Sequence, residues 1–191
     1  DIAIECNGFM HGQRVGILAH RPAPVQINYL AYPGTMGADF YDYIIGDHAV
    51  IPEDQKHNYA ENIIYLPDCY MPDDNTRQIS NKPISRAECG LPDNRFVFCC
   101  FNNSVKIRPQ EFDIWMRLLN KIEGSVLWLL KANEWSESNL RNEASKRGVN
   151  VDRLVFADRL PLEKHLGRLR LADLFLDTFN FNAHTTASDA L

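Results

Sequence analysis

The chain has 191 residues, of which 45% are hydrophobic and 24% are charged, which is the composition of a globular protein. The formal net charge of −5 disfavours nucleic-acid binding, which needs clustered lysine and arginine side chains. No apolar run approaches the ~20 residues of a membrane-spanning helix, and no signal peptide is recognised ahead of the first predicted strand, "DIAIEC". We therefore expect neither a nucleic acid nor a membrane as a partner.

The cysteines point to a reducing environment. There are five of them, and no two have the C-x-x-C spacing, so neither a zinc site nor a disulfide framework is predicted. We expect buried free thiols and a cytoplasmic location. The cysteines are Cys6, Cys69, Cys89, Cys99 and Cys100.

The first part of the chain alternates strand-like runs with turns. Strands are predicted at "DIAIEC", "VQINYLAY", "YDYIIGD" and "NIIYLP", with helical segments between them. This order is typical of a parallel α/β layer.

Residues 68–93 are predicted to connect two lobes, because they are rich in Pro, Asp, Asn and Ser and have almost no apolar period. One helical turn is predicted inside this segment at "SRAECG". Ser85 would be its N-cap, Glu88 the partner three residues later, and Gly90 its end.

A clearer alternation follows the connector. Strands are predicted at "RFVFCCFN", "SVLWLL", "RLVFAD" and "DLFLDT", and helices at "RPQEFDIWMRLLNKI", "SESNLRNEASKRG", "LPLEKHLGRLRLA" and "HTTASDAL". The first of these helices has Pro109 near its start and an apolar face of Phe112, Trp115, Met116 and Leu119. The order βαβαβαβα predicts a doubly wound sheet.

Ligands of a doubly wound sheet bind beyond the carboxyl ends of its strands, and three predicted loops there are polar. "CFNNSVKIRP" contains Asn103 and Lys106, and amide donors with one ammonium group suit a phosphate. "FADRLPLEKHLGRLR" contains His165, three residues before Arg168. Each loop also has an alternative without a ligand. The residues of the first loop could be plain turn residues, and His165 in the second could be a surface or core histidine.

The third loop is the closing stretch, "NFNAHTTASDAL". It places His184, Thr185, Thr186 and Asp189 within six residues at a predicted helix start, where N–H groups and hydroxyls attract anions. Asp189 can accept a hydrogen bond from a sugar hydroxyl. The alternative is that Thr185 or Thr186 only caps the helix, while Ser188 and Asp189 face water. Together the three loops favour a nucleotide site.

Four segments carry a resemblance to a known family: "RPAPVQINYLAYPGTMGADFYDYIIGD", "FVFCCFNNSVKIRPQEFDIWMRLL", "VLWLL" and "DLFLDTFNFNAHTTASDAL". They resemble the catalytic region of the O-linked N-acetylglucosamine transferase and SPINDLY family, glycosyltransferase family 41. The likeness covers nearly the whole chain and is closest to bacterial members linked to TPR repeats.

The resemblance implies an α/β fold of the GT-B type, in which two Rossmann-like lobes with parallel sheets hold the sugar nucleotide in a cleft. Residues 1–67 would be the C-terminal part of the first lobe, 68–93 the connector, and 94–191 most of the second lobe, truncated at its C-terminus. The long insertion of animal members is absent. We expect a fragment of the catalytic region, inactive by itself.

The resemblance also implies roles for individual residues. Lys106 would pair with the diphosphate and is the expected catalytic residue, with Asn103 at a phosphate-contacting position. His165 would lie against the uracil with Arg168 close by, and the backbone near Leu160 would read the edge of the base.

The remaining implied contacts are to the diphosphate, the ribose and the sugar. His184, Thr185 and Thr186 would bind the pyrophosphate, Asp189 the ribose, and Leu30 and Ala31 would border the sugar.

Three departures from the animal pattern stand out. Ala31 replaces a glycine beside the sugar, and Leu162 replaces a lysine near the base. The histidine of the first lobe that is often given a catalytic or donor-positioning role has no equivalent here. His11 and His20 do not replace it, although His11 should lie near the cleft.

The implied activity is metal-independent, inverting transfer of N-acetylglucosamine from UDP-GlcNAc to Ser or Thr of acceptor proteins, with no cofactor. SPINDLY-like transfer of O-fucose from GDP-fucose is one alternative. A non-catalytic nucleotide-binding fragment, or a scaffold without nucleotide affinity, is another.

Overall fold

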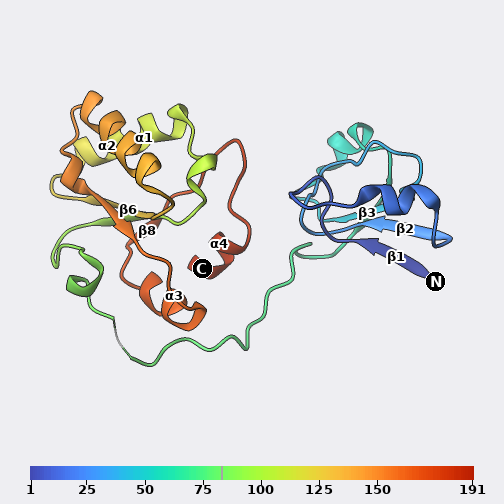
Figure 1. Cartoon of the computed structure of the whole chain (residues 1–191), viewed down its shortest axis with the longest axis horizontal. Coiled ribbons are helices and arrows are strands. Elements are labelled where there is room, and N and C mark those ends of the chain that lie inside the picture. Colours follow the sequence, from blue (N-terminus) through green and yellow to red (C-terminus); the bar gives the residue numbers. More distant parts are fainter. Residues whose placement is uncertain (83) are drawn as a thin grey trace. The chain divides into compact units, whose positions relative to one another are not determined.

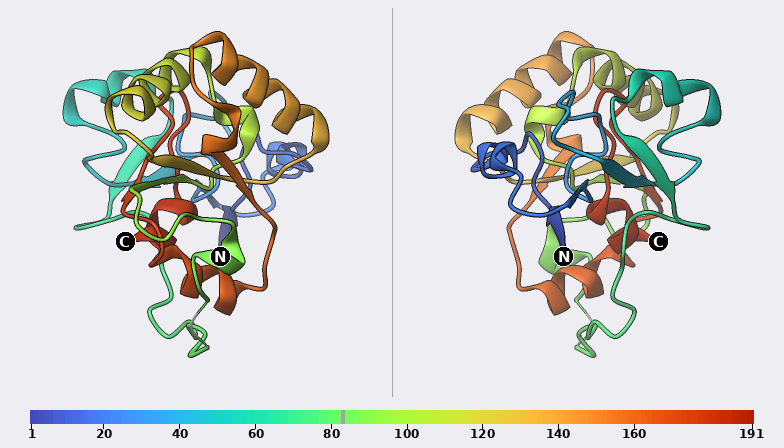
Figure 2. Two further views of the ribbon diagram at one scale, coloured as in Figure 1. Left: turned by 90° about the vertical axis from the view of Figure 1, so that its left-hand side faces the viewer. Right: turned by 90° about the vertical axis from the view of Figure 1, so that its right-hand side faces the viewer.

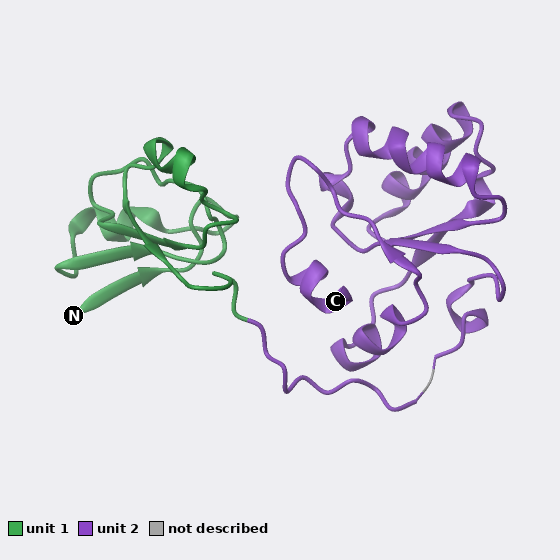
Figure 3. Ribbon diagram, turned by 180° about the vertical axis from the view of Figure 1, so that it is seen from behind, with its two compact units in different colours: residues 1–72 green, residues 73–191 purple. Residues whose placement is uncertain are grey.

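Two four-stranded sheets organise the chain in the computed structural model, one in residues Asp1–Pro72 (unit 1) and one in Asp73–Leu191 (unit 2) (Figure 3). The structure describes residues 1–82 and 84–191. The boundary between the units falls inside the segment 68–93, of which Pro83 lies outside the described residues. Most of that segment therefore belongs to unit 2.

The sheet of unit 1 is parallel throughout, with the strand order β1-β2-β3-β4. Its strands are β1 (Ile2–Glu5), β2 (Val25–Asn28), β3 (Tyr43–Gly46) and β4 (Asn62–Tyr65), and each lies within a run predicted as a strand. Within residues 1–72, all of which are described, the helical segments are the short 3-10 helices η1 (Val15–His20) and η2 (Glu53–Asn58). Full helices between these strands, as in a regular α/β layer, are not formed.

Glycines in the segment after β1 are one physical reason. Gly8 and Gly12 both have a positive φ, of 55° and 80°, which interrupts an α-helix and which glycine adopts at little cost.

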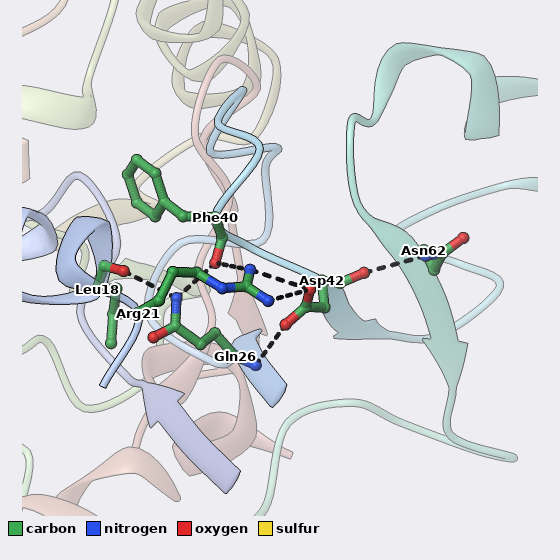
Figure 4. A network of polar contacts seen from close by, with 6 residues as sticks. All are labelled: Leu18, Arg21, Gln26, Phe40, Asp42 and Asn62. Carbon is green, nitrogen blue, oxygen red and sulfur yellow. Dashed lines mark hydrogen bonds and ion pairs between the residues drawn. The ribbon is translucent and has the colours of Figure 1, made fainter. Parts of the chain in front are cut away.

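Asp42, directly before β3, links the strands of unit 1 (Figure 4). Its Oδ2 accepts a hydrogen bond from the backbone N–H of Gln26 at 2.8 Å, and its Oδ1 accepts two from the Arg21 guanidinium at 3.1 Å. The Asn62 amide donates to the Asp42 carbonyl at 3.2 Å. One residue thus connects the starts of β2, β3 and β4.

The Gln26 side chain extends this network into the core. It is fully buried, and its Nε2 donates to the carbonyls of Leu18 and Phe40 at 2.9 and 2.6 Å (Figure 4). These bonds attach η1 and the loop before β3 to the sheet.

The sheet of unit 2 is also parallel, but its order is β7-β6-β5-β8. The strands are β5 (Val97–Cys100), β6 (Val126–Leu130), β7 (Leu154–Ala157) and β8 (Leu174–Phe175). The chain adds β6 and β7 on one side of β5 and then returns to add β8 on the other. This reversal confirms the predicted doubly wound order.

Helices cover both faces of this sheet. The helices α1 (Pro109–Lys121) and α2 (Glu134–Lys146) lie on one side, and α3 (Leu162–Leu169) and α4 (Thr185–Ala190) on the other (Figures 1 and 2). The 3-10 helices η3 (Ala87–Cys89), η4 (Ser104–Lys106) and η5 (Val151–Arg153) complete unit 2.

The alternation of side chains along β5 builds two cores. Phe98 and Cys100 pack with the α1 and α2 side, whereas Val97 and Cys99 pack on the opposite face, beside Trp128. The apolar face predicted for α1 is confirmed, since Phe112, Trp115, Met116 and Leu119 are all buried.

The cysteine prediction is partly wrong. All five thiols are free, and Cys99 and Cys100 are buried as expected, but Cys6 and Cys69 are exposed and Cys89 is intermediate. The two exposed cysteines lie just beyond the ends of β1 and β4, outside the sheet that would cover them.

The predicted turn in the connector forms, with one shift at its start. The backbone N–H and hydroxyl of Ser85 both donate to the Glu88 carboxylate at 2.8 Å, and Gly90 ends the turn with a φ of 68°, as predicted, but the N-cap is Arg86 rather than Ser85. Helix α2 begins at Glu134, earlier than predicted, because Asn133 caps it by accepting from the Ser136 N–H at 2.8 Å.

In the described part of the chain, no helix combines the length and the hydropathy needed to cross a membrane.

Protonation of Asp42 should weaken unit 1. The hydrogen bond from the Gln26 N–H, and then the Arg21 guanidinium, hold the Asp42 pKa below its ordinary value. The carboxylate therefore contributes stability above ~pH 3.9, the value for an unfolded chain, and the contribution is lost as the pH falls through the lowered pKa. In Asp42→Asn, residue-resolved hydrogen exchange of β2 and β3 should show faster opening than in the wild type at pH 6, with the difference shrinking toward pH 3. A difference that does not change with pH would contradict this assignment.

Candidate functional site

A cavity of about 460 Å³ lies in unit 2, at the carboxyl ends of β5, β6 and β7. This is the edge at which open α/β sheets bind their ligands. Its walls come from the loops after these strands and from α3 and α4. The lining residues are Phe101, Asn103, Leu130, Arg159, Leu160, Leu162, His165, Arg168, Thr185, Thr186 and Asp189.

Seven of the eleven predicted site residues meet in this cavity: Asn103, Leu160, His165, Arg168, Thr185, Thr186 and Asp189. Lys106 and His184 stand on neighbouring loops of the same unit. Leu30 and Ala31 belong to unit 1. The three polar loops predicted to converge therefore do so around one cavity.

Arg168 forms a buried polar wall of the cavity. Its side chain is buried, and its guanidinium lies 4.7 Å from the centre of the Phe101 ring, at cation–π distance. Nη1 donates to the Asp158 carbonyl at 2.6 Å, and Nη2 contacts Nδ1 of His165 at 2.9 Å. Burial lowers the pKa of Arg168, but a guanidinium remains charged in a protein.

The contact with Arg168 determines the protonation of His165. A guanidinium can only donate, so Nδ1 of His165 accepts, and the proton of the neutral ring sits on Nε2. Burial lowers the His165 pKa, the Arg168 charge lowers it further, and Asp189 opposes them. At pH 7 the ring is therefore neutral, with Nε2, which carries the proton, 4.0 Å from Oδ2 of Asp189. The alternative of a plain surface histidine does not apply.

Asp189 is held away from solvent. Its side chain is only 10% exposed, and its Oδ1 pairs with Nη1 of Arg77 at 2.5 Å. The alternative in which Asp189 faces water is therefore wrong. The capping alternative is wrong as well, because the N-cap of α4 is His184, and Thr185 and Thr186 lie in the first turn.

Asp177 shapes the loop between β8 and α4. Its Oδ1 accepts from the Asn102 side chain at 2.9 Å and from the backbone N–H groups of Thr178 and Ala183 at 2.7 and 2.8 Å. Asn182 donates to the Thr178 carbonyl at 2.7 Å. The bond to Asn102 joins the ends of β5 and β8, the point at which the strand order reverses.

Lys106 is oriented by this loop. Its Nζ donates to the Asn182 carbonyl at 3.2 Å and lies 4.4 Å from the centre of the Phe181 ring. Burial lowers the Lys106 pKa, and Asp177 opposes that shift. The pKa of His184 is also lowered, by burial first and then by Lys106. The ammonium group therefore stands beside the segment that leads into Thr185 and Thr186.

In unit 1, the loop after β2 that contains Leu30 and Ala31 is firmly held. Nδ2 of Asn28 donates to two carbonyls of this loop, at 3.2 and 3.1 Å. The Glu61 carboxylate accepts from the Thr35 hydroxyl at 2.7 Å. Leu30 has a φ of 88°, a conformation that is uncommon outside glycine and that such contacts maintain. His11 is exposed in the loop that follows β1.

No group of three or more His, Cys, Asp and Glu side chains that could hold a metal ion is found among residues 1–82 and 84–191.

Five residues that shape the cavity were not predicted: Arg77, Phe101, Leu130, Arg159 and Asp177. Asp177 had a visible signal, since it is the penultimate residue of the predicted strand "DLFLDT", at the ligand-binding edge. Arg77 had none, because it lies in the connector, 112 positions from its partner Asp189.

Comparisons with known proteins show which family this fold belongs to. The family model described as glycosyl transferase family 41 matches residues 1–82 and 76–191. The chain belongs to this family. Two relatives from Arabidopsis thaliana are both described as probable UDP-N-acetylglucosamine–peptide N-acetylglucosaminyltransferases: SEC, at 37% identity, and SPINDLY, at 32%. Both alignments cover the whole of this chain.

The solved structure of a mutant O-GlcNAc transferase from Thermobaculum terrenum matches the whole family 41 chain with a TM-score of 0.88 at 28% identity. The fold is therefore of the GT-B type found in this family. The chain spans 20% and 21% of the lengths of SEC and SPINDLY and 36% of the bacterial structure. The alignment with a relative from Caenorhabditis elegans, at 25% identity, is 301 positions long, which is more than the 191 residues of this chain.

The neutral histidines should make unit 2 less stable in mild acid. The pKa values of His165 and His184 are both lowered, so below ~6.5, the value of an unfolded histidine, the unfolded chain binds protons that the folded one does not. The stability present at pH 7.5 is then progressively lost toward pH 5.5. All three tryptophans lie in unit 2, so urea unfolding followed by their fluorescence reports this change.

The matched variants are His165→Gln and His57→Gln. The first should flatten the pH dependence, and the second, an exposed histidine of unit 1, should leave it unchanged. Equal slopes in all three proteins would contradict the assigned protonation of His165.

Proposed function

We propose that the chain is the sugar-nucleotide-binding part of a protein O-GlcNAc transferase, which moves N-acetylglucosamine from UDP-GlcNAc to Ser or Thr of acceptor proteins. The observation that carries the proposal is the cavity at the ends of β5, β6 and β7, where apolar walls meet hydroxyl, amide, imidazole and carboxylate groups. The similarity to SEC supports this donor and reaction, and the similarity to the bacterial O-GlcNAc transferase supports the same transferred sugar. A cytoplasmic location remains part of the proposal.

The two ends of the cavity suit the two ends of a nucleotide. Leu160 and the neutral His165 ring offer an apolar and polarisable surface for a base. Asp189 offers a carboxylate oxygen to a ribose hydroxyl. The hydroxyls of Thr185 and Thr186, in the first turn of α4, offer donors to the diphosphate.

Lys106 is the group that would act on the reaction itself. Transfer of the sugar builds negative charge on the departing diphosphate, and a fixed cation beside it lowers the barrier. Its Nζ uses one donor on Asn182 and keeps two for phosphate oxygens. Metal independence and inversion rest on the family resemblance.

The preference of the chain for one nucleotide over another tests which sugar donor the protein uses. Isothermal titration of the 191-residue chain with UDP and with GDP should give measurable binding of UDP and weaker binding of GDP. Thr186→Val should weaken UDP binding, because it removes a hydroxyl of the cavity and keeps the side-chain shape. A preference for GDP would instead favour transfer of fucose as in the SPINDLY alternative, and absence of any nucleotide binding would overturn the proposal.

Lys106→Ala is expected to be the most damaging single change to catalysis. Removal of a charge-assisted donor that strengthens in the transition state should lower kcat by about 10²–10³-fold, or ~3 kcal/mol. The assay uses the full-length protein that contains this region, because we expect no transfer by the chain alone. Lys164→Ala, which removes an exposed lysine of α3, is the control. Undiminished turnover by a folded Lys106→Ala protein would contradict the role.

A further inference from the structure

The guanidinium of Arg77, in the segment predicted as a connector, uses all three of its nitrogens. Nε donates to the Asp74 carbonyl at 3.1 Å, and Nη2 pairs with Asp73 at 2.9 Å. Nη1 pairs with Asp189 at 2.5 Å. Two contacts thus come from the connector itself and fix the direction of the third. The planar fork of arginine is suited to this, because its donors have fixed relative positions.

Asp189, the partner of Arg77, has one oxygen left for another contact. Oδ1 is taken by Arg77, whereas Oδ2 is 4.0 Å from Nε2 of His165, too far for a hydrogen bond. The side chain is nearly buried and lines the cavity. A helix of six residues such as α4 has little stability of its own, so contacts from outside must set the direction of this carboxylate.

The connector is itself attached to unit 2 on both sides of Pro83. The Ser80 N–H donates to the Glu163 carbonyl in α3 at 3.0 Å. Further along, Arg86 donates to the Leu171 carbonyl and pairs with Asp173, both at 3.0 Å. Arg77 is therefore carried by a segment that is bound to the unit containing the cavity.

We propose that Arg77 is a positioning residue of the nucleotide site: it holds Oδ1 of Asp189 so that Oδ2 faces the cavity and accepts a hydrogen bond from a ribose hydroxyl. This inference rests on the proposed function. The pair is largely shielded from solvent, with side chains 19% and 10% exposed, so removal of Arg77 leaves the Asp189 carboxylate without its partner. A positioning role is therefore distinguished by ligand discrimination, which a loss of stability alone would not change.

The test compares two ligands that differ only in the ribose. UDP and 2′,3′-dideoxy-UDP are titrated calorimetrically into the 191-residue chain and its variants. Arg77→Ala should weaken UDP binding about tenfold, equivalent to ~1.4 kcal/mol, and leave the binding of the dideoxy analogue unchanged. Arg77→Lys, which keeps the charge but loses the fork, should recover part of the loss.

Arg86→Ala is the matched control, because it releases another anchor of the same segment and does not touch Asp189. It should bind both ligands like the wild type. Equal weakening of both ligands in Arg77→Ala, or no weakening of either, would overturn the positioning role and leave the proposed function intact. Equal affinity of the wild-type chain for UDP and the dideoxy analogue would also overturn it. A wild-type chain that binds neither ligand would overturn the proposed function, and the role of Arg77 with it.

Discussion

The pairing of β5 with both β6 and β8 is the constraint on which the site depends. Because the chain reverses its direction of growth at β5, the loops after β5 and β8 leave the sheet side by side at its carboxyl edge. The bond between Asn102 and Asp177 joins them, and Lys106 reaches from one loop to the Asn182 carbonyl of the other. Without this reversal, the cation and the threonines of α4 would belong to separate regions.

Burial then sets the chemistry of the groups collected there. Desolvation lowers the pKa values of Lys106, His165 and His184, and the nearby cations Arg168 and Lys106 add to the effect on the two histidines. The histidines are therefore neutral donors and acceptors at pH 7, and Lys106 and Arg168 supply the positive charge. This division suits a ligand with a neutral base at one end and an anionic diphosphate at the other.

Each unit fixes one of its polar loops by the same means, a buried or half-buried acid that accepts from backbone or hydroxyl donors. Asp177 does this in unit 2, and Glu61, which accepts from Met36 and Thr35, does it in unit 1. Such loops keep one conformation because rotation would leave a buried carboxylate without its donors. In the connector, Arg77 plays the part of the donor and holds the Asp189 carboxylate in a similar way.

The sequence by itself determined the strands, the doubly wound order and most of the cavity. These depend on the periodic pattern of apolar residues and on residues that are close together in the sequence. His165 and Arg168, for example, are three residues apart on a helix and must face the same way. It also indicated helical segments between the strands of unit 1, where the described residues 1–72 form only short 3-10 helices, and buried thiols at Cys6 and Cys69 that no sheet covers. Only the tertiary structure decided which distant groups meet. Arg77 and Asp189 are 112 positions apart, and Lys106 and Asn182 are 76 apart. No local preference encodes such pairs, since they form only when the packed sheet brings their loops together.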